Sequence, residues 1–250
     1  MGIPIVIPSH KRADRVYAKN IVLDPIICVA KSQAEQYRRL NPDCEIVTHP
    51  DSVVGLIPKR NWMARHFGDL FMIDDDVDCV KNLNTERGES AVIRDRERIT
   101  RIINELYDIA SMLDVNLFGF TSSTSPVMYD ESAYLSLSRM ITGCSYGVRK
   151  SKNIWWNEEL KLKEDFWISC YVKYKERRVL TDLRYHFAQK GTFINAGGLA
   201  SIRNQDEERR SILLIKKSFG DTIRLKGQGC NGKDKTRSLV EYNISARFRF

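Results

Sequence analysis

The sequence predicts an α/β fold with a mostly parallel sheet, because short apolar runs and helical segments alternate along its first half. The runs at 3–7, 26–30, 45–48 and 70–73 have the length and composition of buried strands. Such alternation is typical of a parallel sheet that helices cover on both faces. The 250 residues are enough for one large domain of this kind with its own core.

The two early helices have recognisable ends. Ser32 and Glu35 form a capping-box pattern, so we expect the first helix to begin there and to continue to about residue 40. Pro58 suits the first turn of the second helix, and Gly68 suits the position that ends it.

The second half continues the pattern. Apolar residues recur at helical spacing from Ile99 to Leu113, and a strand at 116–120 follows. An aromatic-rich helix is expected from Glu164 to Lys175. We divide the chain into a main domain at 1–205 and a basic extension at 206–250 that packs on it.

Composition indicates a folded protein without a membrane segment. Hydrophobic residues make up 42% of the chain, and no run approaches the roughly 18 apolar residues of a membrane span. The first residues lack the basic start and cleavage site of a signal peptide. The six cysteines include no CxxC pair, which disfavours a zinc site and is typical of reduced thiols. We therefore expect a cytoplasmic protein without a membrane partner.

The net charge of +8 is concentrated toward the C-terminal end. The last 45 residues hold eleven Lys and Arg against six Asp and Glu. A basic segment of this kind attracts a polyanion such as DNA. A solvated surface that favours solubility explains the same charge, so the sequence leaves both interpretations open.

The strand at 70–73 runs directly into the turn Asp74-Asp75-Asp76, at the sheet edge where ligands of α/β proteins bind. Adjacent carboxylates repel one another unless a cation offsets their charge. Mg²⁺ and Mn²⁺ prefer oxygen ligands and keep coordination places for phosphate oxygens. We expect Asp74 and Asp76, two residues apart, to face one such ion while Asp75 turns away. An acidic surface turn is the alternative.

Lys59, Arg60 and Asn61 lie in the first turn of the predicted helix that precedes this strand. A helix N-terminus with a cation suits an anion such as a diphosphate, and Arg can grip phosphate oxygens at two places. The sequence therefore favours ligand contact by these residues. An exposed helix start with ordinary charges is the alternative.

A second basic position is the loop after the first strand, which contains Pro8, His10, Lys11 and Arg12. Like the acidic turn, this loop follows a strand and is expected at the ligand-binding edge. Its side chains are placed to touch a nucleotide base, ribose or phosphate. A solvent-facing basic loop fits the pattern equally well.

Two later features carry acid–base chemistry. Glu164 and Asp165 open the aromatic-rich helix, where one of them can act as a general base toward an acceptor hydroxyl. Carboxylates in a first helical turn also simply complement the helix dipole. His186 is a candidate third metal ligand, with a structural histidine as the alternative.

In their order, these features resemble the GT-A glycosyltransferases. The segment 3–12 resembles their opening strand and nucleotide-binding loop, and Lys59-Arg60-Asn61 resembles their basic helix start. Phe71 to Asp76 resembles the strand and DxD motif of that fold, and Glu164-Asp165 resembles its late acidic pair. The resemblance covers about residues 3–200 and implies a GT-A, Rossmann-like domain.

Within that fold the sequence is similar to the TET-associated glycosyltransferases of bacteriophages. The shared points are the compact size, the Pro58-Lys59-Arg60-Asn61 helix start and the Asp-Asp-Asp-Val turn. The resemblance implies a UDP-sugar donor and, as acceptor, a 5-hydroxymethylpyrimidine in phage DNA, such as 5-hydroxymethylcytosine. For a phage protein, the expected cytoplasm is that of the host cell, and with a general base in the late acidic pair we expect the configuration of the sugar to be inverted.

The resemblance assigns roles as well. Asp74 would contact the donor ribose, Asp76 would bind Mn²⁺ or Mg²⁺, and Asp165 would be the catalytic base. The other donor-binding candidates are Pro8, His10, Arg12, Lys59, Arg60, Asn61 and Asp75. We expect Arg60 and the metal to stabilise the charge on the leaving diphosphate.

Three alternatives remain open at this stage. A GT-A enzyme that acts on a glycan, a lipid carrier or a protein would show the same motifs. A nucleotidyltransferase also uses metal-binding aspartates on an α/β sheet. A noncatalytic DNA-binding module that retains the fold would keep the basic end without the chemistry.

Overall fold

The structure, a computed structural model, describes residues 2–86, 89–190, 204–225 and 244–246. A large sheet in this part of the chain consists of β1 (Ile5–Pro8), β2 (Ile26–Ala30), β3 (Glu45–His49), β4 (Leu70–Ile73), β7 (Leu117–Phe120), β8 (Leu135–Ser136), β9 (Ser145–Val148) and β10 (Leu180–Asp182). The eight strands lie in the order β3-β2-β1-β4-β9-β7-β10-β8.

This sheet is mostly parallel. Strand β9 runs antiparallel between β4 and β7, and β8 runs antiparallel to β10, whereas the other neighbours pair in parallel. All four strands expected in the first half of the chain are present. The predicted α/β fold, a mostly parallel sheet flanked by helices, is confirmed.

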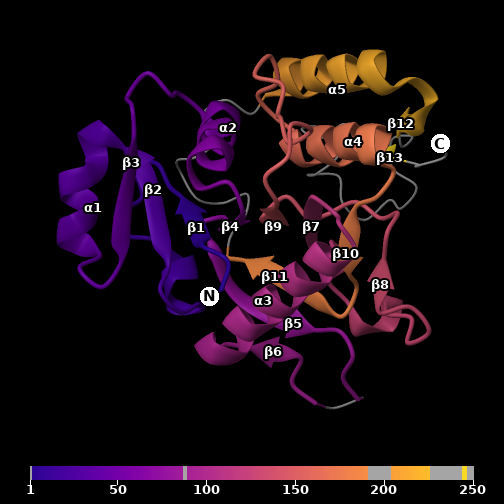
Figure 1. The fold of residues 1–250 in the computed structure, drawn as a ribbon, viewed down its shortest axis with the longest axis horizontal. Helices are drawn as coiled ribbons and strands as arrows, with labels where there is room; N and C mark the ends of the chain where they lie inside the picture. Colours follow the sequence, from indigo (N-terminus) through magenta and orange to yellow (C-terminus); the bar gives the residue numbers. More distant parts are fainter. Residues whose placement is uncertain (1, 87–88, 191–203, 226–243, 247–250) are drawn as a thin grey trace.

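The described residues form five α-helices that flank the sheet or, for α5, lie alongside α4 (Figure 1): α1 (Ala34–Leu40), α2 (Leu56–Phe67), α3 (Arg96–Met112), α4 (Glu164–Glu176) and α5 (Gln205–Phe219). Buried side chains of α1 and α3 share one apolar core with Ile5 and Ile7 of β1. Those of α2, α4 and α5 share a second core with Val6. Alternate residues of β1 thus face opposite cores, as the two-residue period of a strand requires.

A smaller antiparallel sheet follows the acidic turn. It consists of β5 (Val77–Asn82), β6 (Val92–Ile93) and β11 (Tyr185–Gln189), in the order β11-β5-β6. Because Val77 pairs with Gln189, this sheet brings the end of β11 beside the acidic turn. The sequence analysis did not predict β5.

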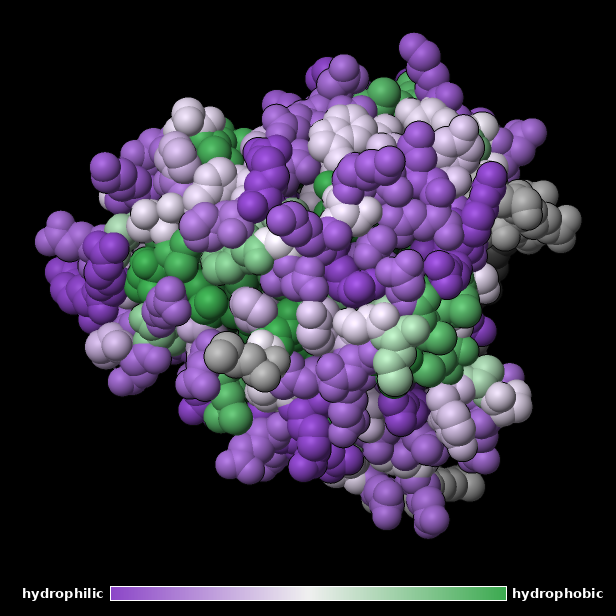
Figure 2. Space-filling view, viewed as in Figure 1, coloured by the Kyte–Doolittle hydropathy of each residue, from purple (hydrophilic) through white to green (hydrophobic). Residues whose placement is uncertain are grey.

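The remaining elements are short. Short 3-10 turns in the described residues lie at η1 (Tyr17–Asn20), η2 (Lys31–Gln33), η3 (Pro126–Met128) and η5 (Gly220–Thr222), and β12 (Ile223–Leu225) pairs with β13 (Ile244–Ala246). Within the described ranges, no helix combines the length and apolar character that crossing a membrane requires. The face of the molecule in Figure 2 is mostly hydrophilic, with separate hydrophobic patches.

The start of the first helix differs from its prediction. The capping box at Ser32 and Glu35 was wrong, because the Ser32 hydroxyl donates to Asp51 at 2.6 Å and α1 begins only at Ala34, after η2. Helix α2 begins at Leu56, so Pro58 lies in its first turn, as predicted. Its predicted end is confirmed, since Gly68 follows the helix at φ 75°, where a side chain would be strained.

Gly147 allows three central strands to pack closely. It lies on β9 between Phe71 of β4 and Phe118 of β7. A Cβ atom at this position would lie 2.1 Å from Cζ of Phe118, well inside van der Waals contact. The Phe118 ring therefore occupies the space that any other residue at 147 would need.

We expect Gly147→Ala to lower the free energy of unfolding by about 1–3 kcal/mol, the usual cost of overpacking a core. Urea denaturation followed by circular dichroism would measure the change. Phe118→Leu added to this variant should recover part of the loss, because it vacates the space. An alanine variant as stable as the wild type would contradict the packing argument.

Candidate active site

Four segments that are distant in sequence meet at the carboxyl edge of the parallel strands. They are the loop after β1, the acidic turn after β4, the residues just before β9, and the first turn of α4. The amide of Asp74 donates to the carbonyl of Cys144 at 2.8 Å, which joins the turn to the segment before β9. This edge is where the sequence analysis expected a ligand site.

Asp75 organises the loop after β1. Its carboxylate accepts the Ser9 hydroxyl at 2.6 Å and the Arg12 Nη1 at 2.9 Å, and its carbonyl accepts the amide of Tyr17 at 2.7 Å. The Tyr37 hydroxyl completes the arrangement, 2.7 Å from the hydroxyl of Ser9. Asp75 is buried, and its side chain points away from those of Asp74 and Asp76. It therefore supports the candidate ligand site through its hydrogen bonds and does not line it.

Arg60 joins the acidic turn to α4. Its fully buried guanidinium donates from Nη2 to Asp74 at 3.1 Å, to Glu164 at 3.3 Å and to the Gly143 carbonyl at 3.1 Å. It also lies over the Tyr146 ring, 4.9 Å from the centroid. Burial alone would lower the pKa of Arg60, but Tyr146, Asp74 and Glu164 raise it above its ordinary value. The side chain therefore stays charged between two carboxylates.

The neighbours of Arg60 also face inward. Lys59 Nζ donates to the Ser9 carbonyl at 2.6 Å, and burial lowers the pKa of this amine to about 8. The Asn61 amide bonds to the Trp156 backbone and to Glu158 at 2.8–3.0 Å. We expected all three residues to contact a ligand from the first turn of the helix, but their side chains are buried and bond to the protein.

Asp74 and Asp76 keep part of their side chains accessible, with exposed fractions of 24% and 16%. Burial raises the pKa of Asp74, Arg60 opposes this rise, and the nearby Asp76, Glu164 and Asp75 add to it, so that the pKa is about 7. Burial also raises the pKa of Asp76, although Gln189 donates to its carboxylate at 2.8 Å.

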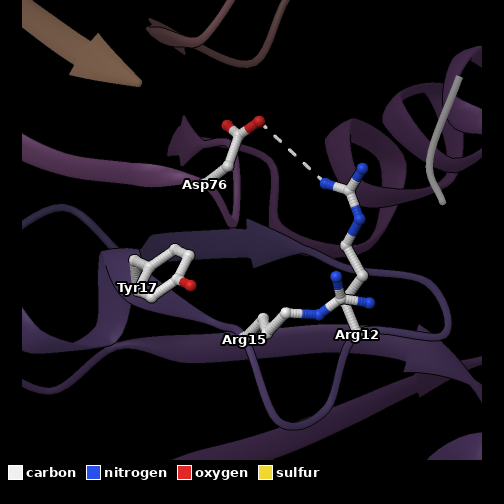
Figure 3. A pocket seen from close by; sticks show the side chains of 4 residues that line it. All are labelled: Arg12, Arg15, Tyr17 and Asp76. Atoms are coloured by element: carbon white, nitrogen blue, oxygen red, sulfur yellow. Dashed lines mark ion pairs between the residues drawn. The ribbon is translucent and has the colours of Figure 1, made fainter. Parts of the chain in front are cut away.

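A small, partly open cavity lies beside Asp76 (Figure 3). Arg12, Arg15 and Tyr17 line it together with Asp76, and Arg12 points toward Asp76 with its Nη1 4.0 Å from the carboxylate. The amine of Lys190 lies 4.8 Å from the centroid of the Tyr17 ring. Two guanidiniums, one aromatic ring and one carboxylate therefore surround a space suited to an anionic ligand.

The donor set at Asp74 and Asp76 fits a hard divalent ion, because Mg²⁺ and Mn²⁺ need only one or two protein carboxylates beside water and phosphate oxygens. In the described part of the chain, no group of three His, Cys, Asp or Glu residues is arranged to hold a metal. An ion at this site would take its remaining ligands from solvent and substrate.

Glu164 and Asp165 lie at the start of α4, on the far side of Arg60 from the turn. Glu164 is buried against Arg60, whereas Asp165 packs against Gly143, where an added Cβ would lie 3.2 Å from the Asp165 carboxylate. Burial and the adjacent Glu164 raise the pKa of Asp165 to about 6. A carboxylate of this kind is ionised at neutral pH and basic enough to accept a proton.

Three predicted residues lie apart from the Asp74–Asp76 turn or point away from it. His186 pairs with Lys81, and its Nδ1 lies 3.0 Å from the Thr121 carbonyl, while Gln189 of the same strand contacts Asp76. His10 is exposed and bonds to Gln33 at 2.9 Å, and Pro8 is buried in β1.

Arg15, Tyr17 and Gln189 at the site were not predicted from the sequence. Arg15 and Tyr17 follow the basic loop directly and share its mixture of charged and aromatic residues, which was a usable signal. No signal in the sequence marked Gln189, because only the pairing of β11 with β5 brings it to Asp76.

The sheet, the acidic turn at the end of β4 and the carboxylate pair at the start of α4 define the GT-A class of Rossmann-like fold. Residues 3–198 match the TET-Associated Glycosyltransferase family, and the chain belongs to this family. The resemblance inferred from the sequence is thereby confirmed. The chain has no match among curated proteins.

We expect Arg60→Met to lower the free energy of unfolding by about 3–5 kcal/mol, because it leaves Asp74 and Glu164 facing each other without a buried cation. Urea denaturation at pH 7.5 measures the loss. Arg149→Met is the matched control, since Arg149 pairs with the exposed Asp114 and its loss should cost under about 1 kcal/mol. Equal losses in the two variants would contradict the role given to Arg60.

We also expect a pH-dependent effect of Asp165→Asn on the metal-free protein. A folded-state pKa near 6, above the ordinary 3.8, means that folding favours the protonated form. The resulting stability is complete below about pH 4 and is lost as the pH rises through 6. The melting temperature of Asp165→Asn minus that of the wild type should therefore increase between pH 4 and pH 7. A difference that stays constant over this range would contradict the burial of an ionisable Asp165.

Proposed function

We propose that this protein is a metal-dependent glycosyltransferase that moves a sugar from a UDP-sugar to the hydroxyl of a 5-hydroxymethylpyrimidine in DNA, with 5-hydroxymethylcytosine as the principal acceptor. The observation that carries the proposal is the convergence of two parts at one sheet edge. A cationic cavity ends at Asp76, and a carboxylate of raised pKa, Asp165, lies across Arg60 from the acidic turn. Membership of the glycosyltransferase family supports the reaction class.

The cavity beside Asp76 is assigned to the donor. The guanidiniums of Arg12 and Arg15 can bind diphosphate oxygens, and the ring of Tyr17 offers a face on which a flat base can stack. Asp74 and Asp76 would hold Mn²⁺ or Mg²⁺, which supplies positive charge to the leaving diphosphate. The buried Arg60 contributes indirectly, because it orients Asp74 and does not face the cavity.

Asp165 is assigned to the acceptor. Its carboxylate takes the proton of the acceptor hydroxyl while that oxygen forms a bond to the anomeric carbon, and the bond from this carbon to the diphosphate breaks to release UDP. Attack from the face opposite the diphosphate inverts the configuration. The neighbouring Glu164 is held by Arg60 and acts through its charge, which helps to raise the pKa of Asp165.

The assignment of DNA as the acceptor rests on charge and family. The chain carries a net charge of +8, with its excess in the last 45 residues, which favours contact with phosphates. Part of that basic end, at 226–243 and 247–250, lies outside the described residues. A GT-A enzyme with a glycan, lipid or protein acceptor would use the same donor site, so the acceptor is decided by experiment.

We expect the wild type with Mn²⁺ and a panel of UDP-sugars to add the mass of one sugar residue to nucleosides from 5-hydroxymethylcytosine DNA, as measured by mass spectrometry. Asp76→Ala should abolish the gain, and Asp165→Asn should lower kcat by about 10²–10⁴-fold through loss of the base. Asp78→Ala is the matched control, because Asp78 pairs with Arg94 rather than lining the cavity.

Each other result has a distinct meaning. Metal-dependent release of UDP without a modified nucleoside would keep the glycosyltransferase and exclude this DNA acceptor. A product that contains the nucleotide would indicate nucleotidyl transfer. DNA binding with neither product nor UDP release, for every donor in the panel, would contradict an enzymatic function.

A further inference from the structure

Lys163, the residue just before the Glu164-Asp165 pair, has an unusual backbone. Its φ and ψ of 62° and 38° place it in the left-handed region, which is disfavoured for a residue with a Cβ atom. It is nevertheless the N-cap of α4, and its carbonyl accepts the amide of Trp167 at 3.1 Å. The conformation of Lys163 therefore sets the direction in which α4 begins.

The side chain of Lys163 is tied to the C-terminal helix. Its Nζ lies 2.9 Å from Oε2 of Glu208 on α5, and the Glu208 carboxylate is completely buried while the Lys163 side chain is 16% exposed. Water cannot readily replace either partner at such a site, so breaking the pair removes a charge–charge contact from a buried position. This contact opposes the backbone preference of Lys163.

Helix α5 is well suited to hold that contact in place. Its N-terminus is capped by Asn204, whose side chain accepts the amide of Glu207 at 2.8 Å. Ile212 and Ile215 pack in the same apolar core as Trp167 of α4, and Figure 1 shows α5 lying alongside α4. Helix α5 lies beyond residues 3–198, the part that matches the family.

We propose that Glu208 is a positioning residue for the reaction: by pairing with Lys163, it fixes the left-handed N-cap of α4 and with it the orientation of the Asp165 carboxylate. The role of Asp165 as base rests on the proposed function, whereas the effect on α4 does not. Glu208 itself touches no substrate. The pair also offsets the charge of Lys163, which lies close enough to Asp165 to lower its pKa.

The test is a double-mutant cycle on Lys163 and Glu208. Glu208→Gln leaves the Lys163 charge without its partner, and we expect kcat to fall about tenfold while KM for the UDP-sugar stays within about twofold. Lys163→Gly removes the Lys163 ammonium from the buried Glu208 carboxylate and should lower kcat similarly. The double variant should recover most of kcat, because glycine adopts the left-handed conformation freely and no unpaired charge remains.

Asp206→Asn is the matched control. It removes an exposed carboxylate from the first turn of the same helix and should leave kcat unchanged.

Hydrogen exchange supplies a readout that needs no activity. The Trp167 amide bonds to Lys163, so its protection should fall in Glu208→Gln and return in the double variant. This pattern supports the positioning role even where the wild type transfers no sugar, in which case the proposed function alone fails. Additive effects in the cycle, or unchanged kcat and exchange in a folded Glu208→Gln protein, would overturn it. Should Glu208→Gln not fold, a double variant no more active and no better protected than Lys163→Gly would also overturn it.

Discussion

The site depends on one buried cation held between carboxylates from two distant segments. Asp74 and Glu164 both bond to Nη2 of Arg60, which lies fully buried on the ring of Tyr146. Without a positive charge between them, the two acids would repel each other in a low-dielectric interior. Because one guanidinium satisfies both, the acidic turn and the start of α4 are fixed relative to each other. The metal-binding and proton-accepting parts of the proposed site thus share one structural support.

The three consecutive aspartates make different contacts because their side chains point in different directions. Asp75 faces Ser9 and Arg12 and gives the loop after β1 its shape. Asp74 faces Arg60, and Asp76 lines the cavity and accepts Gln189. Since burial raises the pKa values of both Asp74 and Asp76, this pair is charged only at an electrostatic cost, which a bound cation would offset.

How much of this could be predicted from the sequence depends on whether the signal is local. Strands with an apolar run and an acidic turn directly after one of them predicted the sheet, its edge and Asp74–Asp76. The roles of Lys59 to Asn61 could not be predicted, because the groups that they bond to lie on segments distant in the sequence. Gln189 reaches Asp76 only through the register of β11 on β5, and Glu208 reaches Lys163 only through the packing of α5 beside α4. Neither contact leaves a local pattern in the sequence.

Several cationic side chains bond to groups of the protein itself. In the proposed function, the anionic donor is therefore bound by a loop and not by a helix N-terminus. Lys59 is committed to the Ser9 carbonyl, Arg60 to two carboxylates and Lys163 to Glu208. Arg12 and Arg15 are the cations that border the cavity, and both lie on the loop that Asp75 orders. In the proposed function, the donor is therefore bound by the loop after β1, and the proton is taken by a carboxylate on α4.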